Sequence, residues 1–302
     1  MTQTIGRLIT ALVTPFTDDG LKIDHGRVER LVAHVVAGGS DGLLVGGTTG
    51  EGPTLSESEF FALLRTVKAC APPEIGVMAN VGTNSTAASI ERAKQAAAFG
   101  INSLLVVCPY YNKPPQAGLI AHYEAVSRAT PLPIMIYNIP GRTAVNMLPE
   151  TVAAVIEGCP TVVAIKEASG DLAQMERVIE LCPKAPRFEL WSGDDGLLAE
   201  VMALGGVGVV SVLSHIAGPA LNEIIDAAYD GDWKTARSRQ AALKPLVEAA
   251  FCTTNPIGIK TMLNLSGVAV GPCRLPLCPP SPAELKKIKA ALAGVTEKPA
   301  IR

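Results

Sequence analysis

The chain of 302 residues is 48% hydrophobic, and its 26 Lys and Arg residues nearly balance its 28 Asp and Glu residues, which gives a net charge of −2. That balance excludes the basic excess that binding to nucleic acid or anionic lipid needs, so we expect small-molecule substrates as partners. No stretch approaches the roughly 18 to 20 apolar residues of a membrane span. Seven scattered cysteines without a CxxC pair predict reduced thiols in a cytoplasmic protein.

Short β-branched runs alternate with longer amphipathic stretches from the N-terminus to about residue 231. The predicted strands are residues 8–13, 42–45, 75–79, 103–107, 134–137, 162–165, 188–191 and 207–210. The helical stretches between them include residues 28–37, 57–69, 86–99, 118–129 and 172–181. Eight such units predict an α/β fold, a (β/α)8 TIM barrel, for which about 250 residues are typical.

An open, doubly wound sheet is the structural alternative to the barrel. Such a sheet usually has fewer strands and commonly carries a glycine-rich, dinucleotide-binding turn after its first strand. Here that turn reads Thr14-Pro15-Phe16-Thr17, which cannot cradle a pyrophosphate. The number of strands and the missing glycines favour the barrel.

The strand pattern stops at about Asp232, and only helical patterns follow, at residues 233–251, 256–265 and 282–292. We expect residues 1–231 to form the catalytic barrel domain and residues 232–302 to form a C-terminal helical region. A loop rich in Pro and Cys, which contains Cys273 and Cys278, interrupts the helical region, and its sequence suggests no function.

Active sites of such barrels lie at the C-terminal ends of the strands, and the predicted sixth strand runs directly into Lys166 and Glu167. A lysine that abuts a buried apolar strand is costly to hold as a cation. A neutral amine is what attack on a carbonyl requires, so Lys166 is a candidate Schiff-base nucleophile. A lysine that snorkels past the strand end, or that pairs with Glu167, is the alternative, and this segment alone leaves both open.

Two other lysines compete for the role of nucleophile. Lys113 lies in a proline-flanked loop and Lys260 in a late helical segment, and neither ends a predicted strand. Because lysine side chains are mostly exposed, a solvated amine is the expectation for both.

Schiff-base chemistry also needs proton transfer, because the carbinolamine loses water and the enamine forms by loss of a proton from carbon. Tyr137 ends the predicted fifth strand, so its phenol is expected within about one inter-strand spacing, ~5 Å, of Lys166. The Thr48 hydroxyl is a candidate link between Tyr137 and Tyr111. The alternative for a lone tyrosine at a strand end is a structural role at the barrel rim, with its hydroxyl hydrogen-bonded and no part in catalysis.

Two groups are candidates for holding substrate carboxylates. Thr48 and Thr49, between glycines at the start of a helical segment, offer hydroxyl and backbone N–H groups, although the same sequence is compatible with an ordinary tight loop. Arg142 follows Tyr137 closely enough to overhang the same barrel mouth, where its guanidinium can bind a carboxylate bidentately. A surface salt bridge is the alternative role for Arg142.

Other kinds of site find no support in the sequence. The four histidines, at positions 25, 34, 122 and 215, share no metal-ligand spacing, which disfavours a metal-dependent aldolase. The glycines of Gly205-Gly206-Val207-Gly208 precede the predicted eighth strand and are expected at the structural end of the barrel. We therefore expect neither a metal nor a cofactor.

Six motifs closely resemble dihydrodipicolinate synthase, in order along essentially the whole chain. They are GTTGE at 47–51, YYNKP at 110–114, YNIPGRT at 137–143, IKEASGD at 165–171, SGDD at 192–195 and NPIGIK at 255–260. The resemblance implies a lysine-dependent pyruvate aldolase that condenses pyruvate with L-aspartate 4-semialdehyde to 4-hydroxy-tetrahydrodipicolinate, on the route to lysine and diaminopimelate.

The resemblance also implies roles for individual residues. Lys166 would form the pyruvate imine, with Tyr137 as proton donor and acceptor. Thr48 would relay protons to Tyr111, which crosses from a neighbouring subunit, and the need for that partner implies a homotetramer of tight dimers. The implied substrate-binding residues are Thr49 for the pyruvate carboxylate, Arg142 for the carboxylate of aspartate semialdehyde, and Val210, which lines the pocket through its backbone carbonyl.

Sister aldolases share the barrel, the lysine and the YNxP tyrosine, so another pyruvate-dependent aldolase, acting on a keto-deoxy sugar acid or 4-hydroxy-2-oxoglutarate, stays open. In N-acetylneuraminate lyases the first motif resembles GSTGE instead of GTTGE, and the arginine of YNxPxRT is missing. Thr48 and Arg142 together therefore favour the synthase. A catalytically inactive barrel, retained as a binding subunit, is the alternative from another class. The presence of Lys166, Tyr137 and Thr48 argues against it.

Members of the family that are inhibited by lysine use polar residues, notably histidine and glutamate, in a pocket at the dimer interface. The corresponding positions here are Glu57, Phe60 and Ala88, with Asn84 and Tyr110 retained. Because the lysine amine loses its carboxylate partner at Ala88, we expect feedback by L-lysine to be weak or absent.

Overall fold

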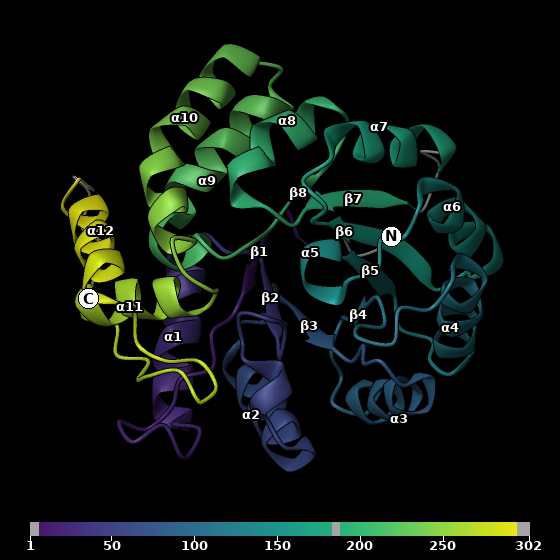
Figure 1. Ribbon diagram of the computed structural model, residues 1–302, viewed down its shortest axis with the longest axis horizontal. Helices are drawn as coiled ribbons and strands as arrows, with labels where there is room; N and C mark the ends of the chain where they lie inside the picture. Colours follow the sequence, from purple (N-terminus) through teal and green to yellow (C-terminus); the bar gives the residue numbers. More distant parts are fainter. Residues whose placement is uncertain (1–5, 183–187, 295–302) are drawn as a thin grey trace.

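Eight parallel strands close into a barrel in the computed structural model, which describes residues 6–182 and 188–294. Each strand pairs with the strands before and after it, and β1 pairs with β8 to complete the ring (Figure 1). The strands are β1 (Leu8–Ala11), β2 (Gly42–Val45), β3 (Gly76–Asn80), β4 (Ser103–Val107), β5 (Ile134–Asn138), β6 (Val162–Glu167), β7 (Glu189–Ser192) and β8 (Gly208–Ser211). The predicted TIM barrel is confirmed.

The limits of β2 and β4 are the predicted ones, and the other strands differ by one or two residues. β1 ends before Val13, whose N–H bonds to His215 Nε2 instead of to a neighbouring strand. β6 continues two residues beyond its predicted end, so Lys166 and Glu167 are part of the strand and lie in register with β5. This extension fixes the directions of both side chains.

Helices surround the barrel on its outside (Figure 1). They are α1 (His25–Ala37), α2 (Glu57–Cys70), α3 (Thr86–Ala97), α4 (Gln116–Arg128), α6 (Pro149–Gly158), α7 (Leu172–Leu181), α8 (Leu198–Ala203) and α9 (Ser214–Tyr229). The five helical stretches predicted between strands fall on α1, α2, α3, α4 and α7. Shorter elements lie in the loops, namely α5 (Pro140–Thr143) and the 3₁₀ turns η1 (Gly52–Thr54) and η2 (Asp195–Leu197).

Three further helices follow the barrel, α10 (Trp233–Ala250), α11 (Ile257–Leu265) and α12 (Pro282–Ala293) (Figure 1). α10 packs against α8 and α9, α11 packs against α9 and α10, and α12 packs against α10 and α11. The predicted C-terminal helices are therefore confirmed. The division into two domains after residue 231 stays a prediction, and residues 295–302 lie outside the described ranges. Within those ranges, no helix is both long enough and apolar enough to span a bilayer.

Strand side chains alternate between two apolar layers, as the two-residue period of a strand requires. The inner layer fills the barrel with Ile9, Ala11, Leu44, Met78, Leu105, Met135, Tyr137, Ala164, Trp191 and Val210. The outer layer joins the opposite faces of the strands to the surrounding helices. Because Lys166 follows Ala164 by two residues, its side chain projects into the barrel, whereas Glu167 lies on the outer face.

Candidate active site

The side chain of Lys166 lies against the ring of Tyr137 on the neighbouring strand. Lys166 is 5% exposed, and its Nζ is 4.3 Å from the centroid of the Tyr137 ring. The two residues are register partners in β6 and β5, which explains the short separation. An amine is thus held over an aromatic face at the end of the sixth strand.

Glu167 does not pair with Lys166. Its buried carboxylate accepts hydrogen bonds from Asn138 Nδ2 at 3.0 Å, from the Ser169 N–H at 2.8 Å and from Gln174 Nε2 at 3.2 Å. Burial raises the pKa of Glu167, and these donors act in the opposite direction. Because the two side chains lie on opposite faces of β6, pairing does not explain the burial of Lys166.

A cavity of about 490 Å³ opens at the C-terminal ends of the strands. Its lining includes Thr48, Tyr137 and Arg142, so three of the predicted site residues face one space. The volume and the mixture of apolar walls with a few polar groups are typical of a small-molecule site.

Two predicted site residues are more deeply buried. Thr49 is 2% exposed, and its hydroxyl oxygen accepts a hydrogen bond at 3.0 Å from Nδ2 of Asn255, which lines the cavity. Val210 is 1% exposed and belongs to the inner layer together with Tyr137. Sequence reasoning missed Asn255 as a site residue, although it opens the NPIGIK motif. Its buried Oδ1 has no partner among the described residues.

The loop that carries the two threonines is a tight turn. The N–H of Glu51 donates to the carbonyl of Thr48 at 3.1 Å. A Cβ atom on Gly52 would lie 2.2 Å from the carbonyl oxygen of Gly46, so only glycine fits there. The turn leads into η1, and α2 begins only at Glu57. The expectation that the threonines open an α-helix is wrong, and the loop presents their hydroxyls without a helix N-terminus.

Arg142 and Tyr111 lie in loops at the mouth of the barrel. Arg142 is part of α5, which crosses the mouth in Figure 1, and it is exposed where it lines the cavity. Tyr111 has a left-handed φ of 74° and is 87% exposed. Its side chain therefore faces solvent in the single chain and is not part of the cavity lining.

Lys260 is buried, and the expectation of a solvated amine is wrong. It is 2% exposed, and Nζ donates to Glu51 Oε1 at 2.8 Å and to the carbonyls of Thr14 at 2.9 Å and Pro272 at 2.6 Å. Burial lowers the pKa of Lys260, whereas Glu51 raises it. The helical period around Lys260 could not show that the chain near Pro272 folds back over the GTTGE loop. Lys113 is exposed, as expected.

The structure also bears on the metal site and the phosphate-binding glycines that the sequence disfavoured. In the part of the chain that the structure describes, no three His, Cys, Asp or Glu side chains gather closely enough to hold a metal ion. A Cβ atom on Gly208 would lie 2.0 Å from the carbonyl oxygen of Arg7, which immediately precedes β1. The glycines before β8 therefore lie at the structural end of the barrel, as predicted.

A closed (β/α)8 barrel with a cavity at the C-terminal ends of its strands makes the chain a TIM-barrel protein with a candidate site where the active sites of this class lie. Comparison with known proteins narrows that class, because residues 4–294 match the Dihydrodipicolinate synthetase family. The chain belongs to this family, and it is an enzyme of the lyase type.

Relatives match this chain over nearly its whole length. The 4-hydroxy-tetrahydrodipicolinate synthase of Thermosynechococcus vestitus is 48% identical over 288 residues, which are 95% of this chain and 96% of the relative. The protein of the same name from Prochlorococcus marinus (strain MIT 9303) is 50% identical over 293 residues, 97% of this chain and 96% of the relative. A solved structure of dihydrodipicolinate synthase from Cyanidioschyzon merolae with lysine bound has a TM-score of 0.93 and 45% identity, and covers 96% of this chain and 97% of that chain.

Proposed function

We propose that the protein is a 4-hydroxy-tetrahydrodipicolinate synthase, which condenses pyruvate with L-aspartate 4-semialdehyde through an imine on Lys166. The observation that carries the proposal is the amine of Lys166, buried at the end of β6 with Nζ 4.3 Å from the centroid of the Tyr137 ring. Imine chemistry needs an amine nucleophile and a proton-transferring hydroxyl at one carbonyl, and this pair supplies both. The names of the relatives support aspartate semialdehyde as the acceptor.

The reaction follows from these positions. Nζ of Lys166 attacks C2 of pyruvate, and the carbinolamine loses water to leave the imine. Loss of a proton from C3 then gives an enamine, whose C3 attacks the aldehyde carbon of the acceptor. Tyr137 lines the cavity beside Nζ and takes and returns these protons, and Thr48 extends the relay within the same cavity. Because the product is cyclic, the amine of the acceptor adds at C2 and releases Lys166.

Two carboxylates have to be held during this sequence. The hydroxyl oxygen of Thr49 accepts from Asn255 Nδ2 at 3.0 Å, which leaves the Thr49 O–H free to donate to the pyruvate carboxylate. The backbone carbonyl of Val210, whose side chain belongs to the inner layer together with Tyr137, is the proposed contact at the inner end of the site. Arg142 is at the exposed mouth of the cavity, where its guanidinium suits the carboxylate of the incoming acceptor.

The proposed enzyme is a homotetramer of two tight dimers that works in the cytoplasm. The exposure of Tyr111 is an argument for the dimer. This large aromatic side chain is 87% exposed in one chain, and it would be buried and functional if it entered the active site of a neighbouring chain. The seven cysteines are free thiols, which fits a reducing compartment.

Assays with different substrates test the proposal against the other aldolases. Purified enzyme is given pyruvate with aspartate semialdehyde, and separately a keto-deoxy sugar acid or 4-hydroxy-2-oxoglutarate in the cleavage direction. We expect the highest kcat/KM with aspartate semialdehyde, no turnover by Lys166→Ala, and normal turnover by Lys113→Ala, the matched control at an exposed lysine. A higher kcat/KM with another substrate would assign that aldolase instead, and a folded enzyme that turns over none of them would favour the non-catalytic barrel.

A further inference from the structure

A buried charge network joins the loop of the two threonines to a segment far along the chain. We name residues 47–52 the threonine loop and residues 271–277 the C-terminal arm. The side chain of Glu51 is fully buried, and its Oε1 accepts from Lys260 Nζ at 2.8 Å while its Oε2 accepts from the backbone N–H of Arg274 at 2.7 Å. Both carboxylate oxygens are occupied, so Glu51 cannot turn without losing a bond.

Lys260 extends the network to the loop after β1. Its ammonium has three N–H groups, and they donate to Glu51, to the carbonyl of Thr14 at 2.9 Å and to the carbonyl of Pro272 at 2.6 Å. The hydroxyl of Thr14 in turn donates to the carbonyl of Gly50 at 2.6 Å, inside the threonine loop. One buried cation therefore ties together three segments that are distant in sequence.

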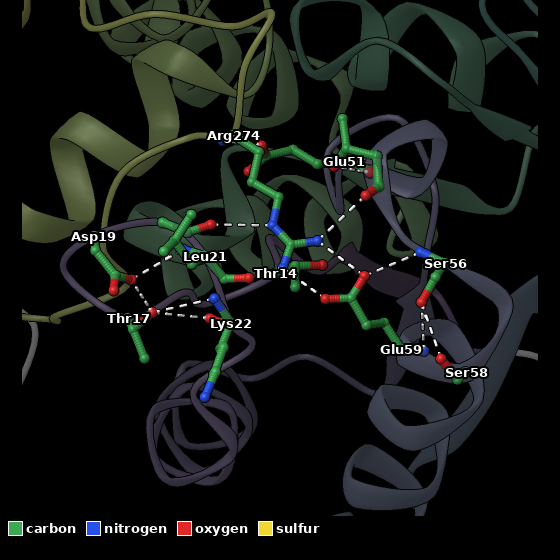
Figure 2. A network of polar contacts seen from close by, with 12 residues as sticks. Thr14, Thr17, Asp19, Leu21, Lys22, Glu51, Ser56, Ser58, Glu59 and Arg274 are labelled. Carbon is green, nitrogen blue, oxygen red and sulfur yellow. Dashed lines mark hydrogen bonds and ion pairs between the residues drawn. The ribbon is translucent and has the colours of Figure 1, made fainter.

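Arg274 fastens the arm at a second place, shown in Figure 2. Its two terminal nitrogens donate to the two oxygens of Glu59 at 3.0 and 2.6 Å, and its other bonds go to the carbonyls of Gly20, Leu21 and Thr54. Hydrogen bonding to Arg274 is the main reason that the pKa of Glu59 falls to about 2. Because Glu59 is in the first turn of α2, the arm is bound just beyond the end of the threonine loop.

Beyond Arg274 the arm reaches the candidate active site. The N–H of Leu277 donates to the carbonyl of Arg274 at 3.0 Å, which closes a turn. Pro276 and Leu277 then line the same cavity as Thr48 and Tyr137. The arm is thus a wall of the cavity and also the anchor of the threonine loop.

We infer that Glu51, Lys260 and Arg274 are positioning residues that set the place of the Thr48 hydroxyl for proton transfer. Glu51 lies three residues after Thr48, and its N–H closes the turn on the Thr48 carbonyl, so a shift of Glu51 moves Thr48. A displacement of about 1 Å at a reacting group lowers the rate by about 10²-fold. The inference rests on the proposed function, because the Thr48 relay is part of it.

The variant Glu51→Gln tests the anchor with almost no change of shape. An amide has one acceptor oxygen, so either the Lys260 ammonium or the Arg274 N–H then faces an NH₂ group. The loop has to shift to relieve that contact. The variant Lys260→Met keeps the apolar stem and removes all three donors. In the double variant the Gln NH₂ takes the place of the lost ammonium. We therefore expect the double variant to lose less activity than the two single losses multiplied together would predict.

Asp41→Asn is the matched control. The carboxylate of Asp41 also accepts from two backbone N–H groups, those of Arg7 and Leu8, both at 2.8 Å, but at the structural end of the barrel. Its amide variant loses one acceptor in the same way and is expected to lower the melting temperature without affecting proton transfer. Arg274→Lys is a milder variant of the arm, which keeps the charge and loses the bidentate bond to Glu59.

The readout is the exchange of pyruvate methyl hydrogens for deuterium in D₂O, followed by NMR, because enamine formation exchanges them without any acceptor. In Glu51→Gln and Lys260→Met we expect exchange to slow by about 10- to 100-fold, and in Arg274→Lys to a smaller extent. Borohydride should still trap the pyruvate imine in each, because Lys166 and Tyr137 belong to β6 and β5. Asp41→Asn should exchange at the wild-type rate.

Wild-type exchange in Glu51→Gln and Lys260→Met, with a melting temperature lowered as in Asp41→Asn, would overturn the inference and leave the network a structural brace. If the slowing factors of Glu51→Gln and Lys260→Met multiplied in the double variant, Glu51 and Lys260 would act independently, which would also contradict the inference. Absence of an imine in the wild type would overturn the proposed function itself, and the inference with it, so the two failures are distinct.

Discussion

Lys166 and Glu167 are adjacent in the chain and have opposite surroundings, because successive side chains of a strand point to opposite faces. Lys166 faces the barrel interior beside Tyr137, whereas Glu167 is hydrogen-bonded by Asn138 and Gln174 on the outer face. A carbonyl that reaches Nζ of Lys166 also meets Tyr137. At the scale of single residues, the proposed chemistry therefore depends first on the phenolic hydroxyl of Tyr137.

Replacing Tyr137 by Phe removes this hydroxyl and keeps the ring against Lys166. We expect kcat to fall by about 10²-fold or more, the usual contribution of a positioned acid–base group, with little change in melting temperature. Steady-state kinetics with pyruvate and aspartate semialdehyde check this. Tyr229→Phe is the control, because the Tyr229 hydroxyl bonds to the Val207 carbonyl away from the cavity. A kcat of Tyr137→Phe close to the wild-type value would exclude the proton-transfer role.

Feedback by L-lysine is the second prediction at the residue scale. The Glu57 carboxylate is bound by Arg92, whose Nε donates at 2.7 Å and whose side chain lines the cavity, and Ala88 is exposed. A lysine amine entering there meets the Arg92 cation, so we expect weak or no inhibition when turnover is measured over a lysine titration. Ala88→Glu should increase the inhibition, and Ala87→Glu, at the exposed neighbouring position, should not. Strong inhibition of the wild type by sub-millimolar lysine would refute the prediction.

At the scale of elements, the strands and the longer helices could be predicted because each carries its own apolar period. Lys166 could be found because it ends such a period, and the ends of parallel strands meet at one mouth. The environment of Lys260 could not be predicted, because its acceptors are on segments that only the tertiary fold brings together. The same holds for Asn255, whose partner Thr49 lies near the other end of the chain.

His215 joins the start of α9 to the end of β1. Its Nδ1–H donates to the Val212 carbonyl at 2.8 Å, and its Nε2 accepts the N–H of Val13 at 3.2 Å, so the bonded ring is neutral. Burial is the main cause that lowers the pKa of His215 to about 4, and nearby His34 adds to the effect. Acid must protonate this ring before the contact is lost.

The pH dependence of stability follows from that shift. Because the pKa of His215 in the folded state is below the ordinary histidine value of 6.5, His215 contributes stability above pH 6.5 that is lost as the pH falls toward about 4. The linked free energy of unfolding is about 3 kcal/mol over this window. Urea unfolding at several pH values should show a smaller loss for His215→Gln, which does not titrate, than for the wild type. Equal losses in both proteins would contradict the assignment.

At the scale of the whole molecule, the C-terminal region is joined to the catalytic barrel through the buried contacts of Lys260 and Arg274. A second connection is proposed between chains, because Tyr111 is 87% exposed and does not line the cavity of its own chain. The sequence pattern alone could not give this direction. If Tyr111 acts in the neighbouring subunit, two inactive variants should complement each other when they are combined in one dimer.

Co-expression of Tyr111→Phe and Lys166→Ala chains tests whether Tyr111 acts across the dimer. Each variant alone should have little activity. In a mixed dimer, the site of the Tyr111→Phe chain keeps Lys166 and receives an intact Tyr111 from its partner, so random pairing should restore about a quarter of the sites. Activity of the purified mixed enzyme is compared with that of the two variants mixed after purification. No recovery on co-expression would mean that Tyr111 acts within its own chain or not at all.

The imine itself is the most direct measurement. The enzyme is incubated with pyruvate, reduced with borohydride and digested, and the modified peptide is identified by mass spectrometry. We predict a reduced pyruvate adduct on Lys166, which requires pyruvate and is absent from Lys166→Ala. An enzyme that turns over pyruvate while Lys166 stays unmodified, or that carries the adduct on Lys113 or Lys260 instead, would contradict the proposed mechanism.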